Sequence, residues 1–325
     1  MRVIVHGIGA IGGTVAATLA LAGHEVVGIA RGAQLAAIRA QGMVVRTPDR
    51  VLTARFDCVA DPSEITFRPD DAILLTVKSQ QTEAALDQLA RAGVTDQPLF
   101  CAQNGVANER RALRRFPNVH GVTVMMPADY LTPGEAVCYG TPRHGIFDIG
   151  CYPGGTDAAD TALAAVLNTA GIAAFADPSV MESKYGKLLM NLQNIVETAI
   201  GAGEAARRLH ALLEAEAKTV LTAAGITWRD VGASDPRRAE LMRMGKVAGV
   251  QRAGSSTAQS LARQTGSLET DFLNGEIALL GRLHGVPAPL NTGALRLAAR
   301  LLREGLAPGA LPVSEVEAML GIQPA

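Results

Sequence analysis

The first 32 residues of the chain place a glycine-rich turn between an apolar run and an alanine-rich segment. Residues 2–6 are mostly apolar, glycines follow at positions 7, 9 and 12, and a second apolar run covers residues 25–29. This pattern predicts a strand, a tight turn, a helix and a second strand. In such a unit Gly7 allows the sharp turn, Gly9 leaves room for a pyrophosphate, and Gly12 lets the helix pack closely against the sheet. We therefore expect a nucleotide-binding βαβ unit rather than a purely structural turn.

The end of the second predicted strand indicates which nucleotide is bound. Proteins that hold NAD through the ribose 2′-hydroxyl place Asp or Glu about 20 residues after the first glycines. Here that place reads Ile29, Ala30, Arg31. It holds no carboxylate to repel a 2′-phosphate, and a guanidinium can bind one through two hydrogen bonds. The sequence favours NADP(H), and the plainer alternative is an exposed loop arginine.

Composition narrows the class of protein. A chain of 325 residues exceeds the size at which one core keeps growing, so we expect two domains. With 30 basic and 31 acidic residues and no long run of one sign, neither nucleic acid nor an anionic membrane is expected as the main partner. No signal segment or long uncharged apolar run is evident, so we expect a cytoplasmic protein. Four scattered cysteines without a CxxC pair indicate reduced core thiols and no metal site: Cys58, Cys101, Cys138 and Cys151.

Strand and helix patterns alternate over the first half of the chain. This alternation predicts an α/β domain with a parallel sheet covered by helices on both faces. From Ser179 onward the pattern is helical, with no convincing strand, and we place the boundary at Asp177 and Pro178. The prediction is a nucleotide-binding domain over residues 1–177 and a helical domain over 178–325. Within the first domain we expect helices at 33–41, 81–92, 107–116 and 157–170, strands at 72–77, 98–102, 119–126 and 172–175, a hairpin over 43–58 and a closing hairpin within 136–150.

Polar residues follow two of the predicted strands. Lys78 comes after the strand at 72–77, and Gln103 and Asn104 come after the strand at 98–102. Open α/β sheets bind ligands beyond the carboxyl ends of their strands. A lysine there can reach a phosphate or a ribose hydroxyl, and an asparagine can pair with a carboxamide. The alternative is that these are ordinary polar residues leaving a sheet.

A predicted helix over residues 180–200 is apolar around most of its circumference. Lys187, Asn191, Asn194 and Thr198 recur at spacings of four, three and four, which places them on one face. A helix this apolar should be buried on several sides, so its polar face needs a water-filled cleft or hydrogen-bond partners. The alternative is a polar stripe on an exposed helix. Only five of the 30 basic residues are lysines, so lysine is expected mainly where arginine cannot replace it. Proton transfer is such a role, because a guanidinium stays protonated, and this favours Lys187 and Lys78 as functional residues.

Further polar residues precede the last predicted helices. Ser255 and Ser256 lie in a GSSTAQ segment and are free to serve as ligand hydroxyls. Ser267 is expected to be the N-cap of a following helix. His284, just before Gly285, is expected to end a helix rather than to act in catalysis.

Taken together, these motifs resemble the ketopantoate reductase family over nearly the whole chain. The matching segments are GIGAIG, VKSQQT, AQNGVANE, KLLMN, SST and LETDFLNGEIALLGRLHGVPAPLNT, in family order. The resemblance implies an N-terminal Rossmann-type doubly wound sheet, an all-helical C-terminal domain and an active site in the cleft between them. It also implies reduction of a 2-oxo acid to a 2-hydroxy acid with NADPH, as in pantothenate biosynthesis.

The resemblance also assigns roles to single residues. It implies that Lys187 is the catalytic lysine that protonates the ketone oxygen, and that Glu269 is its acidic partner near the nicotinamide. The implied substrate-binding residues are Asn104, Asn191 and Ser256, of which Ser256 holds the carboxylate. The implied cofactor contacts are Gly7, Ile8, Gly9, Ala10, Ile11, Gly12, Arg31, Lys78, Asn104 and Glu269.

The chain departs from the family pattern beside the catalytic lysine. A second asparagine is usual eight residues after the lysine, but this position is Ile195, and Asn194 lies about 100° away around the helix. The segment between Ser256 and Glu269 is also longer than usual. Loss of a hydrogen-bonding amide can change substrate selectivity strongly. Three readings follow: a ketopantoate reductase, a reductase of another branched or amino-acid-derived oxo acid, or an NADPH-binding sensor without turnover. The large helical half is compatible with a homodimer.

Overall fold

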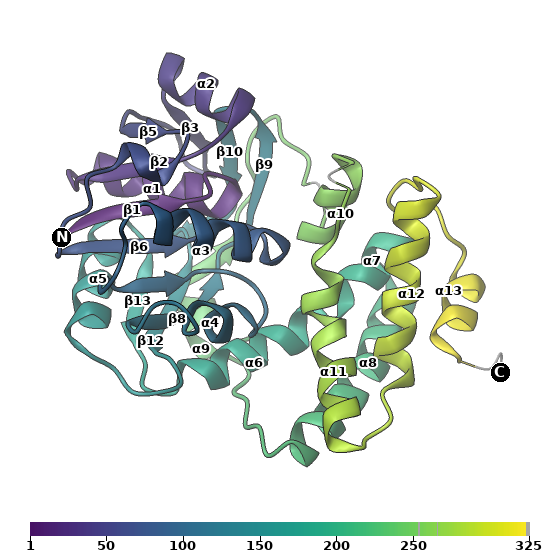
Figure 1. The fold of residues 1–325 in the computed structure, drawn as a ribbon. Coiled ribbons are helices and arrows are strands. Elements are labelled where there is room, and N and C mark those ends of the chain that lie inside the picture. Colours follow the sequence, from purple (N-terminus) through teal and green to yellow (C-terminus); the bar gives the residue numbers. More distant parts are fainter. Residues whose placement is uncertain (253, 265, 323–325) are drawn as a thin grey trace. The chain divides into compact units, whose positions relative to one another are not determined.

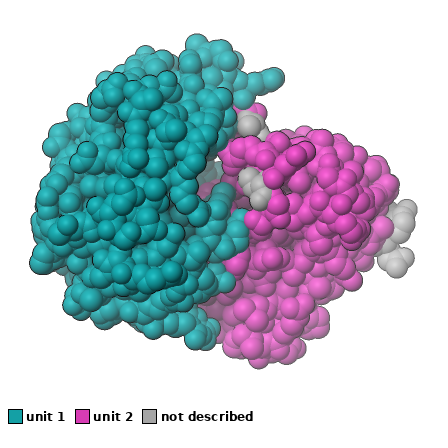
Figure 2. Space-filling view, turned by 45° about the horizontal axis from the view of Figure 1, so that its top comes forward, with its two compact units in different colours: residues 1–104, 108–184, 231–251 teal, residues 105–107, 185–230, 252–325 magenta. Residues whose placement is uncertain are grey.

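The chain folds into two compact units. The computed structural model describes residues 1–252, 254–264 and 266–322. The first unit comprises residues 1–104, 108–184 and 231–251, and the second comprises residues 105–107, 185–230 and 252–325 (Figure 2). No helix within the described ranges has the length and apolar character needed to span a bilayer. The units divide the chain after residue 184 and again around 231–251. It stays a prediction that residues 1–177 bind the nucleotide and residues 178–325 bind the substrate.

The first unit is built on an eight-stranded sheet with the order β13-β12-β8-β7-β6-β1-β2-β5. The six strands from β5 to β8 are mutually parallel, and their order is that of a doubly wound nucleotide-binding sheet. The predicted parallel sheet is confirmed for these six strands, and toward the other edge β12 is antiparallel to β8. The strands are β1 (Arg2–His6), β2 (Val26–Ile29), β5 (Asp57–Val59), β6 (Asp71–Leu75), β7 (Leu99–Cys101), β8 (Val119–Met125), β12 (Ile146–Cys151) and β13 (Ala173–Ala176).

Helices cover both faces of this sheet, as the sequence predicts (Figure 1). Successive side chains of a strand point to opposite faces, so Val3 and Val5 join one core and Ile4 joins the other. The first core includes α1 (Ala10–Leu21) and α5 (Ala158–Thr169). The second includes α3 (Thr82–Arg91) and α4 (Asn108–Ala112). Both faces are therefore buried, which explains the continuous apolar runs in the strands.

A smaller sheet with the order β4-β3-β10-β9 packs beside α1. Its strands are β3 (Met43–Arg46), β4 (Val51–Ala54), β9 (Ala128–Thr132) and β10 (Glu135–Cys138). The predicted hairpin is confirmed for β3 and β4, which pair antiparallel, but residues 57–59 leave it and pair with β2. The closing hairpin expected within 136–150 is wrong, because β10 belongs to the small sheet and β12 to the large one. Local patterning cannot tell which sheet a strand joins.

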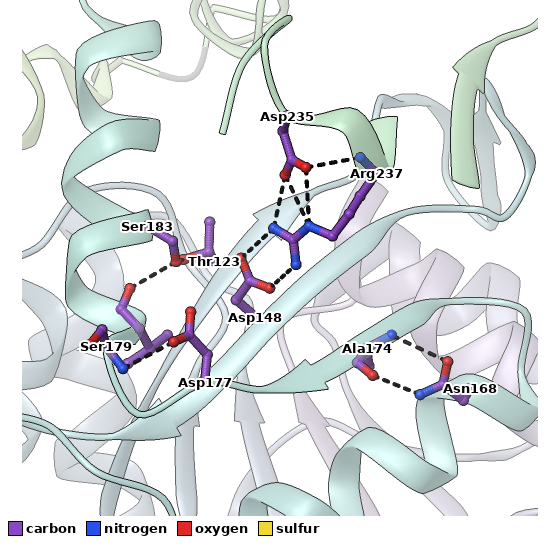
Figure 3. Close-up of polar contacts among 10 residues, drawn as sticks. Thr123, Asp148, Asn168, Ala174, Asp177, Ser179, Ser183, Asp235 and Arg237 are labelled. Carbon is purple, nitrogen blue, oxygen red and sulfur yellow. Dashed lines mark hydrogen bonds and ion pairs between the residues drawn. The ribbon is translucent and has the colours of Figure 1, made fainter. Parts of the chain in front are cut away.

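Residues 231–251 return to the first unit and hold the antiparallel edge of its sheet. Here α9 (Pro236–Leu241) leads into β14 (Met242–Met244), which pairs with β11 (Gly140–Pro142). The guanidinium of Arg237 donates to both carboxylate oxygens of Asp148 on β12, at 2.7 and 3.1 Å, and to Asp235 at 2.8 Å (Figure 3). These hydrogen bonds raise the pKa of Arg237. No strand was predicted after residue 179, and a strand of three residues is too short to show a period.

The remaining helices follow the predicted helical pattern, with two differences. The helix expected over 180–200 is divided at Leu192 into α6 (Val180–Asn191) and α7 (Gln193–Ile200). No helix starts at Ser267; a 3₁₀ turn begins at Glu269 and α11 at Asn274. As predicted, His284 ends α11 and is followed by left-handed Gly285. The other helices are α2 (Gly32–Gln41), α8 (Glu204–Ala223), α10 (Ser256–Ala262), α11 (Asn274–His284), α12 (Pro289–Arg303) and α13 (Val313–Leu320), with 3₁₀ turns η1 (Pro62–Glu64), η2 (Ser79–Gln81) and η3 (Glu269–Phe272).

Candidate active site

The glycine turn lies where the order of the large sheet reverses, between β1 and β6. Gly7 has φ +113°, and a Cβ there would lie 2.7 Å from the backbone nitrogen of Val77 in the loop after β6. A Cβ at Gly12 would overlap the carbonyl oxygen of Gly7 and lie 2.5 Å from Thr76 Oγ1. At Gly9 a Cβ would meet nothing within 4 Å. Gly7 and Gly12 thus permit close packing, while Gly9 borders open space.

The N-terminus of α1 points its backbone N–H groups into the space beside Gly9. Gly9 is the N-cap and makes no side-chain capping bond, and the first turn carries no acidic side chain. The carbonyl groups of the turn are already engaged: Thr76 Oγ1 donates to Gly7 at 2.7 Å, and Gln34 Nε2 donates to Ile8 at 2.9 Å. Because α1 presents its positive dipole end here, the turn is suited to bind a phosphate group.

The loop after β6 is bonded to this turn through Thr76, and the loop after β7 is bonded to the loop after β6. Lys78, which follows β6, is half-buried at the start of η2. Ser79 Oγ donates to the carbonyl oxygen of Asn104 at 3.3 Å, and Gln103 Nε2 donates to that of Val77 at 2.8 Å. The loops after β1, β6 and β7 therefore meet at one edge of the sheet, which we call the carboxyl edge. The structure places Lys78 and Asn104 at this edge, where the sequence predicts them.

Arg31 lies two residues beyond β2 and is exposed at the start of α2. Its charge acts on His6, the last residue of β1, which is 5% exposed. Burial and the positive charge of Arg31 lower the pKa of His6 to about 4. The guanidinium is therefore close enough to contribute positive potential at the carboxyl edge.

The lowered pKa of His6 predicts a loss of stability in mild acid. The folded state holds the imidazole neutral down to about pH 4, whereas the unfolded chain takes up the proton near pH 6.5. The stabilising effect is thus complete above pH 6.5 and is lost as the pH falls toward 4, by at most about 3 kcal/mol. We expect urea unfolding to show this decrease for the natural protein and a smaller one for His6→Asn. Equal decreases in both would contradict the assignment.

In the second unit, the predicted polar stripe is mostly buried rather than exposed. Lys187 is half-buried, whereas Asn191 and Asn194 are 6% and 8% exposed. Thr198 Oγ1 donates to the carbonyl oxygen of Asn194 at 2.6 Å and lies 3.2 Å from Ser255 Oγ. The contact with Ser255 joins α7 to the start of α10, so Thr198 has a structural role.

The serines at the start of α10 differ in role. Ser255 is the N-cap, because its Oγ accepts a bond from the backbone nitrogen of Ala258 at 3.2 Å, so the expectation that it is a free ligand hydroxyl is wrong. Ser256 is half-buried as the first residue of the helix. Glu269 is 6% exposed at the start of η3. Lys187, Asn191, Ser256 and Glu269 thus come from α6, α10 and η3.

A buried amide network, which the sequence did not reveal, fixes the junction of α6 and α7. Asn274 Nδ2 donates to the carbonyl oxygen of Leu192 at 3.3 Å and to Asn291 Oδ1 at 3.0 Å. Asn291 Nδ2 in turn donates to Glu216 at 2.9 Å. The partners are far apart in sequence, so no local pattern could pair them. The network holds the end of the lysine-bearing helix against α8, α11 and α12.

A second polar cluster joins β8, β12 and α5 at the amino end of β8. His120 Nδ1 lies 2.7 Å from Asp160 Oδ1, and its Nε2 lies 2.8 Å from Asn118 Oδ1. The Cys151 thiol donates to Asp160 Oδ2 at 3.4 Å, and Asp157 caps α5. Although these four His, Cys and Asp side chains could hold a metal ion by type, their hydrogen bonds already account for the cluster as a structural tie.

Comparison with known proteins agrees with this architecture. The family model for ketopantoate reductase PanE/ApbA matches residues 3–154, and that for its C-terminal domain matches residues 179–301. The 2-dehydropantoate 2-reductase of Archaeoglobus fulgidus is 28% identical over 300 residues, covering 91% of this chain and 96% of that protein.

Two solved structures extend the comparison to the fold. The PanE/ApbA family ketopantoate reductase from Ralstonia eutropha JMP134 is 27% identical, with a TM-score of 0.78 over 94% of this chain and 99% of that one. The ternary structure of D-mandelate dehydrogenase with NADH and anilino(oxo)acetate has a TM-score of 0.79 over 94% of this chain and 99% of that one. At 23% identity, its likeness concerns the fold alone. The two family models together span most of the chain, which therefore belongs to the ketopantoate reductase family of NADP(H)-dependent oxidoreductases.

Proposed function

We propose that the protein reduces a 2-oxo acid to a 2-hydroxy acid with NADPH, and that ketopantoate is its substrate. The observation that carries the proposal is the open space beside Gly9 at the bare N-terminus of α1. It is a site for a phosphate group at the reversal point of a doubly wound sheet, where such sheets bind dinucleotides.

The residues at the carboxyl edge fit NADP(H). Residues 7–12 would hold the pyrophosphate through backbone N–H groups, and Arg31 would pair with the 2′-phosphate. Lys78 and Asn104, on the next two loops, would contact the ribose and the nicotinamide end. When bound, the cofactor supplies the hydride for the carbonyl carbon. The protein has to bind and orient both reactants and to supply a proton.

Lys187 is the group we assign to that proton. Hydride transfer leaves negative charge on the carbonyl oxygen, which a neighbouring ammonium both stabilises and protonates. Lys187 is half-buried on α6. We assign Asn191 and the Ser256 hydroxyl to the substrate, with Ser256 on its carboxylate, and Glu269 to the support of the lysine and the nicotinamide. These roles require the hydride of the cofactor and the proton of Lys187 to reach the same carbonyl group of the substrate.

A second candidate function keeps the chemistry and changes the oxo acid. Its support is Ile195, which stands where the family pattern usually has an asparagine. The Ile195 side chain is only 1% exposed and packs among protein atoms. The third reading, an NADPH sensor without turnover, is disfavoured because Lys187 and Glu269 are both present.

The test is NADPH oxidation measured with ketopantoate and a panel of branched, aromatic and amino-acid-derived oxo acids. We expect ketopantoate to give the highest kcat/KM. A higher value for another oxo acid would support the second function. NADPH binding without oxidation by any acid would indicate a sensor.

Replacing Arg31 by alanine should erode the preference for NADPH. A hydrogen bond to a charged group contributes about 1.5–3 kcal/mol, so NADPH affinity should fall roughly 10- to 100-fold while NADH affinity is unchanged. Arg39→Ala, on the same helix, is the matched control and should leave both affinities unchanged. In Arg31→Ala the pKa of His6, followed by NMR, should also rise, since a lowering charge is removed. Equal use of both cofactors by the natural protein would contradict the role of Arg31.

The proposal also includes a cytoplasmic location and a homodimer. All four cysteines are free thiols, and Cys58, Cys101 and Cys138 are buried. Burial raises the pKa of Cys58 to about 11, which keeps its thiol protonated and unreactive. Sedimentation analysis of the purified protein would determine the oligomeric state.

A further inference from the structure

A lysine and a glutamate form a buried ion pair in the first unit, and neither is among the residues assigned to the chemistry. Lys184 on α6 is 2% exposed and Glu109 on α4 is 0% exposed. Lys184 Nζ lies 2.5 Å from Glu109 Oε1. Removing two charges from water is costly, and a well-packed apolar pair often gives equal stability. The pair therefore needs an explanation other than stability.

The ammonium group of Lys184 holds the main chain at the end of β7. It donates to the carbonyl oxygens of Cys101 at 3.2 Å and Gln103 at 3.0 Å, and to that of Val122 on β8 at 3.3 Å. An ammonium has three N–H donors, so these bonds can use all of them. Glu109 supplies a negative charge that balances the positive charge of this ammonium, which is buried away from solvent.

The residue that follows Gln103 is Asn104, one of the residues assigned to the cofactor and substrate. Its own carbonyl oxygen accepts bonds from Ser79 Oγ at 3.3 Å and from Asn108 Nδ2 at 3.0 Å. The peptide groups on both sides of Asn104 are thus fixed, the preceding one by Lys184. Without Lys184, the preceding peptide group would lose the bond to the Gln103 carbonyl oxygen, while the following one would keep its bonds from Ser79 and Asn108.

We propose that Lys184 and Glu109 are a positioning pair. They fix the main chain at Asn104 and the position of α6 where Lys184 is bonded to β7 and β8. Lys187 lies one helical turn after Lys184 on that helix. This inference rests on the proposed function, because it concerns the residues assigned there to the reacting groups. A displacement of about 1 Å at such groups can cost on the order of 100-fold in rate.

The test is the double variant Lys184→Met/Glu109→Leu, which removes both charges, keeps similar side-chain volumes and leaves no lone buried charge. We expect it to fold with a melting temperature near that of the natural protein and to bind NADPH with unchanged affinity. Its kcat should fall roughly 10- to 100-fold. A purely structural pair would not separate kcat from stability in this way.

The matched control is the double variant Arg2→Met/Asp71→Leu. These residues form another buried pair, with Arg2 Nε 2.8 Å from Asp71 Oδ1, at the amino ends of β1 and β6. It removes the same kinds of charge from the same sheet, at the edge opposite the glycine turn. We expect its kcat to be unchanged.

Hydrogen exchange of residues 99–104 provides a readout that does not depend on turnover. The Lys184 and Glu109 variant should exchange faster there than both the natural protein and the control. Natural kcat in that variant, or an equal loss in the control, would overturn the inference. If the natural protein reduces no oxo acid, the proposed function fails instead. The exchange rates then decide alone: faster exchange supports the positioning pair and equal exchange overturns it.

Discussion

Replacing Lys187 by alanine is expected to lower kcat by about 10²- to 10⁴-fold, the usual contribution of a positioned proton donor. NADPH affinity should be retained, because the assigned cofactor contacts other than Glu269 lie in the loops that follow β1, β2, β6 and β7. The loss should appear in single-turnover NADPH oxidation as well as in the steady state, since it affects the chemical step. Lys187→Arg should be nearly as slow, because a guanidinium does not give up its proton.

Lys218 provides the matched control for this prediction. It is an exposed lysine on α8, paired with Glu214 at 2.8 Å, and nothing assigns it to the reaction. Lys218→Ala should keep the natural kcat and KM. Natural turnover in Lys187→Ala would remove this lysine from the mechanism, whichever oxo acid is the substrate.

The parts of the fold that could be predicted are those set by neighbours in sequence. The turn at Gly7 and Gly12 is one, since its glycine spacing and the strand and helix that flank it all lie within the first 21 residues. The sequence could not show in the same way which sheet residues 57–59 and 146–151 join. A short apolar strand fits either sheet, and only the packing of the whole unit decides between them.

The candidate site divides along the same line. Lys78 and Asn104 follow strands directly, so strand prediction alone places them at the carboxyl edge. The contacts of Lys184 with Glu109 and of Asn274 with Leu192 join residues 75 and 82 positions apart, and no period reveals them. The scarcity of lysine drew attention to Lys78 and Lys187 but not to Lys184, because the sequence could not show the partners that make Lys184 an internal anchor.

Alanine at Gly9 and at Gly12 should differ in their effects on stability, although both should weaken NADPH binding. A Cβ at Gly9 meets no protein atom within 4 Å, so Gly9→Ala should fold normally, apart from up to about 1 kcal/mol for a poorer N-cap. The methyl group would occupy the space that we assign to the pyrophosphate. Losing one or two hydrogen bonds to a charged group, at about 1.5–3 kcal/mol each, should weaken NADPH binding at least roughly 10-fold.

Gly12→Ala tests the packing role on the same turn of chain. Its Cβ would overlap the carbonyl oxygen of Gly7, a backbone atom that cannot rotate away, so α1 must move from the sheet. Overpacking of this kind costs about 1–3 kcal/mol, and each kcal/mol lowers the melting temperature by roughly 2–4 °C in a domain of this size. We therefore expect thermal unfolding to report Gly12→Ala clearly and Gly9→Ala weakly, with NADPH fluorescence titration showing lost affinity in both. Unchanged NADPH affinity in a folded Gly9→Ala protein would exclude this turn as the pyrophosphate site, because the added methyl group would lie in the space assigned to the pyrophosphate.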